Sequence, residues 1–94
     1  MLYAILFVGA VGVDPDMMTP MLAVGPLDSL KSCAVIGALA LDEMNYAHPE
    51  KDFRIDCSPS PLVARRPDAK LYDVHALAKI ALDILKQEEI PGER

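Results

Sequence analysis

Residues 2–8 read LYAILFV and belong to an uncharged segment that extends from Met1 to Val13. A transmembrane helix needs about 20 apolar residues, and the turn-forming sequence Asp14-Pro15-Asp16 interrupts this segment first. A secretory signal has a basic residue before its apolar stretch, and no Lys or Arg precedes this one. Its content of Tyr, Ile, Phe and Val instead favours a β-strand over residues 2–8. Because the apolar run is continuous rather than alternating, we expect both faces of this strand to be buried.

Two further strands are predicted. Residues 17–24 suit a strand, but Pro20 cannot donate to a ladder, so this strand is short, begins after the proline or lies at a sheet edge. Being consecutive, the first two strands are expected to pair antiparallel. Residues 52–57 read DFRIDC and alternate between apolar and charged side chains, which predicts one buried and one solvated face. A helical crossover joins the second and third strands, so they could be parallel neighbours, and the sheet is expected to be antiparallel or mixed. The predicted buried face holds Phe53, Ile55 and Cys57, and the predicted solvated face holds Asp52, Arg54 and Asp56.

A long helix is predicted between these strands, over residues 30–47. Asp28 or Ser29 can cap it, and Pro49 ends it because the residue before a proline disfavours helical geometry. Its apolar stripe at helical spacing consists of Leu30, Cys33, Ala34, Gly37, Ala38, Leu41 and Met44. Three further apolar residues, Val35, Ile36 and Leu39, lie outside that stripe. A helix that is apolar around most of its circumference is buried on more than one side, so we expect these three to form a homodimer interface.

A second, amphipathic helix is predicted near the C-terminus. Residues 58–67 contain several prolines and predict an extended connection without helix. The helix then runs from Asp68 or Asp73 to Gln87, and Pro91-Gly92 is expected to end the ordered part of the chain. The fold class is therefore α+β, a single domain of residues 1–94. It combines a small three-stranded ββαβ sheet, packed by a long buried helix, with a C-terminal amphipathic helix. The apolar face of that helix holds Val74, Leu77, Ala78, Ala81, Ile84 and Leu85, and its polar stripe holds His75, Lys79, Asp83 and Gln87.

The motifs of known catalytic and metal centres are missing from the sequence. Cys33 and Cys57 are 24 residues apart, outside any CxxC pattern, and we expect two buried free thiols, with a disulfide as the alternative. Cys57, Asp73 and His75 have the residue types of a thiol triad. However, Asp73 and His75, two apart on a helix, point in different directions. The Cys and His residues lack the close pairs of a zinc site. We therefore expect no cofactor and no metal.

Charge points to protein partners. The net charge is −5, and residues 1–50 contain six acids against a single base. This balance argues against nucleic acid and favours binding to another protein. The basic cluster Arg65, Arg66 and Lys70 and the acidic pair Asp14 and Asp16 are the predicted partner-binding residues. We expect no membrane association, and we expect the protein to be cytoplasmic.

The sequence therefore favours a small acidic protein-protein interaction module that acts by binding, as a homodimer. In type it resembles the accessory and inhibitor proteins of bacteria and their phages, although no motif matches a named family. The alternative is an enzyme or ligand-binding subunit whose site forms at a dimer interface. Its first candidates are Asp42, Tyr46, His48 and His75. A third possibility is a secreted protein with a Cys33–Cys57 bridge.

Overall fold

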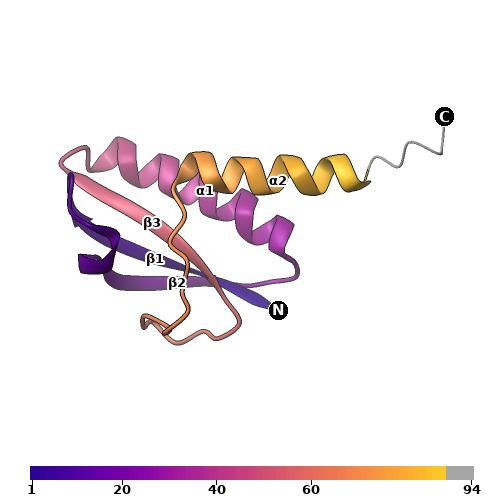
Figure 1. The fold of residues 1–94 in the computed structure, drawn as a ribbon, viewed down its shortest axis with the longest axis horizontal. Coiled ribbons are helices and arrows are strands. Elements are labelled where there is room, and N and C mark those ends of the chain that lie inside the picture. Colours follow the sequence, from indigo (N-terminus) through magenta and orange to yellow (C-terminus); the bar gives the residue numbers. More distant parts are fainter. Residues whose placement is uncertain (89–94) are drawn as a thin grey trace.

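The computed structural model describes residues 1–88 and has the predicted α+β architecture (Figure 1). A three-stranded antiparallel sheet packs against helix α1, and a second helix follows near the C-terminus. The prediction for Pro91-Gly92 lies outside the described residues. The elements, in chain order, are β1 (Leu2–Ala10), the 3₁₀ turn η1 (Pro15–Met17), β2 (Thr19–Leu27), α1 (Leu30–Ala47), β3 (Lys51–Ser58) and α2 (Val74–Glu88).

Strand β1 is the centre of the sheet. The strand order is β2-β1-β3, and Ile5 of β1 faces Ala23 on one side and Asp56 on the other. Both pairings are antiparallel. The parallel pairing of β2 with β3, which the sequence left open, does not form, because α1 carries the chain past β1 to the opposite edge. The expected antiparallel pairing of the first two strands is confirmed.

Strand β2 forms one edge of the sheet, which is one of the three alternatives that Pro20 allowed. Its bounds differ from the expected 17–24, because it begins at Thr19, includes Pro20 and Pro26, and continues to Leu27. The register against β1 shifts between Leu6 and Phe7, next to the pairing of Phe7 with Pro20. An edge position tolerates prolines because half of the backbone N–H groups of an edge strand have no ladder partner.

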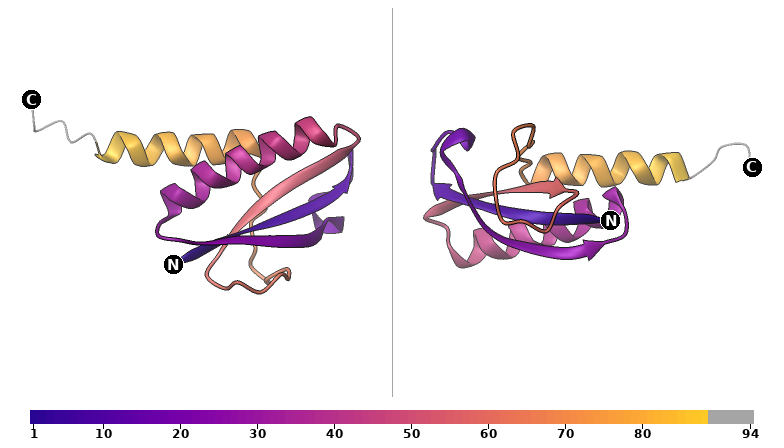
Figure 2. Two further views of the ribbon diagram at one scale, coloured as in Figure 1. Left: turned by 180° about the vertical axis from the view of Figure 1, so that it is seen from behind. Right: turned by 90° about the horizontal axis from the view of Figure 1, so that it is seen from below.

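Both faces of β1 are buried, as the uncharged run predicted. Ala4 and Leu6 belong to a core between the sheet and the helices. Ile5 and Phe7 belong to a second, smaller core on the opposite face, with Met18. That face carries no helix, and the connection between β3 and α2 crosses it instead (Figure 2). The Pro-rich segment is thus a cover for the sheet rather than a solvated linker.

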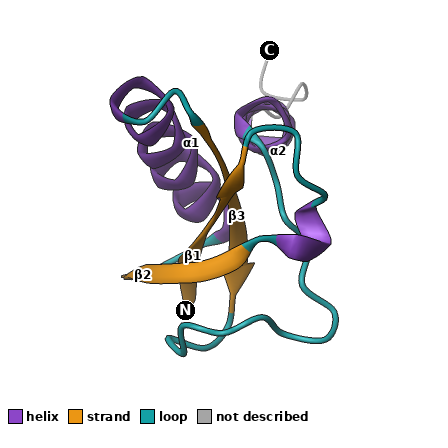
Figure 3. Ribbon diagram, turned by 90° about the vertical axis from the view of Figure 1, so that its left-hand side faces the viewer, coloured by secondary structure: helices purple, strands orange, loops and turns teal. Residues whose placement is uncertain are grey.

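Both helices lie on the other face of the sheet, side by side (Figure 3). Helix α1 has the predicted bounds, and its cap is Ser29, whose side chain accepts a hydrogen bond from Ser32 N at 3.1 Å. Helix α2 begins at Val74, and Asp73 Oδ1 accepts from Ala76 N at 2.8 Å, which makes Asp73 the better of its two predicted starts. The chain reaches α2 through an antiparallel bridge between Tyr72 and Ile55 on the outer edge of β3.

Two predictions about β3 are wrong. Cys57 is not a free thiol but forms a disulfide with Cys33, because α1 crosses the sheet with its buried stripe over β3. Asp56 is not solvated, and only 1% of its surface is exposed. The connection returns over this face and brings Arg66 onto its carboxylate. Alternation correctly separates the two faces of β3, but it does not reveal that both are covered.

Candidate functional site

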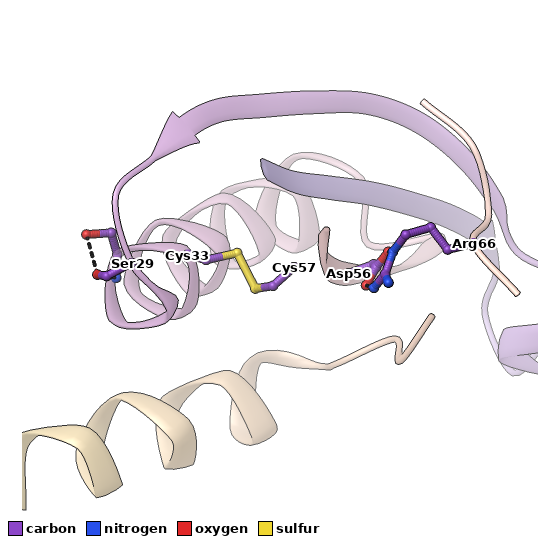
Figure 4. Close-up of a disulfide and its surroundings, with 6 residues drawn as sticks. Ser29, Cys33, Asp56, Cys57 and Arg66 are labelled. Atoms are coloured by element: carbon purple, nitrogen blue, oxygen red, sulfur yellow. Dashed lines mark hydrogen bonds and ion pairs between the residues drawn. A yellow bond between two sulfur atoms is a disulfide. The ribbon is translucent and has the colours of Figure 1, made fainter. Parts of the chain in front are cut away.

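Adjacent residues on β3 attach the two layers that cover the sheet. Cys57 points to the helix face, where its disulfide to Cys33 joins β3 to α1 across a Cα–Cα distance of 6.1 Å. Asp56 points to the opposite face, toward Arg66 of the connection (Figure 4). A strand directs successive side chains to opposite faces, so these neighbours hold different layers. Both are structural links, and neither presents a reactive group to solvent.

Arg66 is paired inside the chain. Its Nη2 donates to Asp56 Oδ1 at 2.7 Å and its Nε to Asp56 Oδ2 at 3.2 Å, while Nη1 donates to Asp68 at 3.1 Å. The hydrogen bonds to Asp56 raise the pKa of the Arg66 guanidinium above its usual value. This bidentate geometry gives a strong pair between a planar guanidinium and a carboxylate. Little of its donor capacity is left for a partner.

Arg65 is engaged in a different way. Its Nη2 donates to the carbonyl oxygens of Pro15 and Met18, both at 2.8 Å, and its guanidinium carbon lies 5.1 Å from the centre of the Phe7 ring. Arg65 therefore fastens the η1 turn to the connection over the smaller core. A guanidinium over an aromatic face is a favourable cation–π arrangement.

The other predicted partner-binding residues are at the surface. Asp14, Asp16 and Lys70 are exposed, and Asp14 Oδ1 caps η1 by accepting from Asp16 N at 3.0 Å. These acids follow the C-terminal end of β1, whereas Lys70 lies just before the Tyr72 bridge to β3. The predicted basic and acidic residues therefore do not form one common binding site.

Three residues considered for catalysis, Cys57, Asp73 and His48, have other partners in the structure. Cys57 is in the disulfide and is unavailable as a nucleophile. Asp73 caps α2 and lies 3.6 Å from Arg54, and His48 Nδ1 lies 3.7 Å from Glu50. Within residues 1–88, no group of three or more His, Cys, Asp or Glu side chains is arranged to hold a metal ion.

An apolar groove lies between α1 and α2. It has a volume of about 450 Å³. Two of the three predicted interface residues, Val35 and Leu39, line it from α1, and Leu82 lines it from α2. Leu39 is 62% exposed and Leu82 57% exposed. The remaining lining residues are Ala34, Ala38, Asp42, Val74, Ala78 and Ala81.

Ile36 is exposed outside the groove. It lies about 200° around α1 from Ala38, which lines the groove, and therefore faces away from α2. On the β2 side of the molecule, a smaller pocket of about 200 Å³ lies between the sheet and the end of α1. Its lining residues are Val8, Met21, Met44, His48, Lys51 and Phe53.

Leu82 is the groove residue that sequence reasoning missed. The stripe of α2 was assigned from Val74, Leu77 and Ala81, and Leu82 lies at its margin. A leucine at the margin of an otherwise complete stripe, like Val35 and Leu39 on α1, is the signal that identifies it.

None of the described helices has the length and apolar content to cross a membrane. Comparison with family models, curated proteins and solved structures finds no match to this chain.

Proposed function

We propose that this chain is a small acidic protein-protein interaction module of the accessory or inhibitor type. It acts by binding rather than by catalysis, and its binding surface is the groove between α1 and α2. The observation that carries the proposal is the exposure of Val35, Leu39 and Leu82 around one apolar groove. Large contiguous apolar surface is rare on proteins that act alone and is typical of interaction sites.

Two features support binding at the groove over binding at the basic cluster. Arg65 and Arg66 use their guanidinium groups within the chain, whereas Leu39 and Leu82 have no comparable internal role. Both helices that form the groove are anchored, α1 by its disulfide and α2 by Leu77, so the groove is preformed. A preformed surface loses little conformational entropy on binding.

The cytoplasmic location expected from the sequence stays a prediction, and the disulfide counts against it. Disulfides persist in oxidising compartments and are rare where glutathione and thioredoxin keep thiols reduced. We therefore favour a compartment outside the reducing cytosol for the mature, oxidised chain.

The proposal is tested by placing a photo-crosslinking amino acid at position 39 in the source cells. The matched control places it at Leu62, which is 69% exposed and lies outside the groove. The expected result is a covalent protein adduct at position 39 and little or none at position 62. Equal labelling at the two positions, or no adduct at position 39, would overturn a binding role for the groove.

A further inference from the structure

We infer that the partner at the groove is a second copy of this chain, docked through a twofold axis with α2 of each copy across α1 of the other. The inference rests on the proposed function, since it names the occupant of the same surface. It is drawn from the distribution of charge on the two helices beside the groove.

The groove has an acidic flank on α1. Leu39, Asp42, Glu43 and Tyr46 follow one another at helical spacing and form one strip. Asp42 lines the groove, and Leu39 lines it one turn earlier. Neither Asp42 nor Glu43 has an ion-pair partner within the part of the chain that the structure describes. An apolar strip with unpaired carboxylates beside it fits a partner that presents apolar and basic groups together.

Helix α2 presents such a strip. His75, Lys79, Leu82 and Lys86 share one side of α2 at helical spacing, and Leu82 lines the groove. Lys79 lies 3.3 Å from Asp83, four residues along the same helix. Exposed pairs of this kind contribute little to stability, so Lys79 can exchange that partner at little cost.

The two strips complement each other only between copies. They flank one groove on the same surface, so placing α2 of a second copy over α1 brings Lys79 toward Asp42 and one Leu82 toward the other copy's Leu39. A twofold axis repeats each such contact, so the surface is self-complementary. Burial of the exposed leucines supplies the affinity, and the charge pairs set the orientation.

Charge reversal tests this arrangement by sedimentation velocity over a concentration series. Asp42→Lys and Lys79→Asp should each weaken self-association by about tenfold or more, because each places two like-charge contacts in the dimer. The double variant Asp42→Lys/Lys79→Asp should recover most of that loss. The control Glu50→Lys makes the same charge change at an exposed position outside the groove and should leave self-association unchanged.

The outcomes separate the second copy from other partners. A wild-type chain that stays monomeric at high micromolar concentration overturns the inference, and an adduct of position 39 with a different protein would then leave the proposed function intact. A dimer in which the double variant is no better than the single ones overturns the crossed arrangement. Recovery in the double variant, with no effect of Glu50→Lys, supports it.

Discussion

The guanidinium of Arg66 holds the buried carboxylate of Asp56 with hydrogen bonds of 2.7 and 3.2 Å. Removing the arginine leaves a charge with 1% exposure and no counter-charge. We therefore expect Arg66→Met to lower the free energy of unfolding by about 3 kcal/mol, measured by urea denaturation. The double variant Arg66→Met/Asp56→Leu should recover much of this loss, because it removes both charges. Lys70→Met, at an exposed site in the same connection, should change stability by less than about 0.5 kcal/mol. If Arg66→Met and Lys70→Met lose similar stability, Arg66 does not act as the counter-charge of the buried Asp56.

Arg65 should behave as a structural residue rather than a binding residue. Arg65→Ala removes two hydrogen bonds to the carbonyls of Pro15 and Met18 and the contact with Phe7. We expect a loss of about 1 to 2 kcal/mol in stability and faster amide exchange in the η1 turn. Self-association should be unchanged. Arg65→Lys keeps the charge but not the planar fork, so it should not restore the exchange protection. Full protection in Arg65→Lys would show that charge alone suffices.

The disulfide should be present in the purified, unreduced protein, and thiol titration should find no free cysteine. It closes a loop of 24 residues, for which the chain-entropy relation gives about 3 to 4 kcal/mol. The double variant Cys33→Ala/Cys57→Ala should lose stability of this order, and reductant should have little further effect on it. Two titratable thiols in the unreduced wild type would contradict the pairing and favour the cytoplasm.

The sequence predicted those features of the structure that depend on residues close together in the chain. The bounds of α1 follow from its cap at Ser29 and the proline after His48, both of which lie next to the helix. Burial of both faces of β1 follows from its continuous apolar run. In contrast, the environment of Asp56 depends on Arg66, ten residues later, folding back across the sheet. Nothing in an alternating strand specifies that return.

The candidate site follows the same division. The apolar excess on α1 was visible in the sequence, and Val35 and Leu39, predicted as interface residues, are exposed in the structure. The groove itself was not visible, because it depends on the position of α2 beside α1. The Cys33–Cys57 pair also required the crossing of α1 over β3, which no sequence spacing encodes.

Asp28 gives a pH-dependent prediction. The hydrogen bond from Ser32 is the main cause that holds the pKa of the Asp28 carboxyl below its usual 3.8. A lowered pKa means that the fold favours the ionised form. The resulting stability is present above pH 3.8 and is lost as the pH falls through the lowered pKa. In an NMR titration, Ser32→Ala should move this pKa upward, toward 3.8. Ser29→Ala removes the helix cap but should move the pKa of Asp28 less than Ser32→Ala does. Equal shifts in the two variants would show that Ser32 is not the main cause of the lowered pKa.

Gly37 marks a close approach of α1 to its neighbours. A β-carbon added there would lie 3.1 Å from Leu77 Cδ1 and 3.2 Å from Ile55 Cγ2, and both side chains are fully buried. Alanine favours a helix by about 1 kcal/mol over glycine, whereas overpacking a core costs about 1 to 3 kcal/mol. Because two buried side chains must move together, we expect the packing cost to exceed the helical gain.

Gly37→Ala should therefore lower the free energy of unfolding by about 1 kcal/mol, measured by thermal and urea denaturation. Shortening one neighbour tests the cause. Leu77→Val destabilises the wild type by leaving space beside Gly37, but the same change should cost less in the Gly37→Ala background, because the added methyl group fills part of that space. Equal costs in both backgrounds would show that the glycine does not set the spacing of α1 and α2. A stability gain in Gly37→Ala would show that helix propensity outweighs packing at this position.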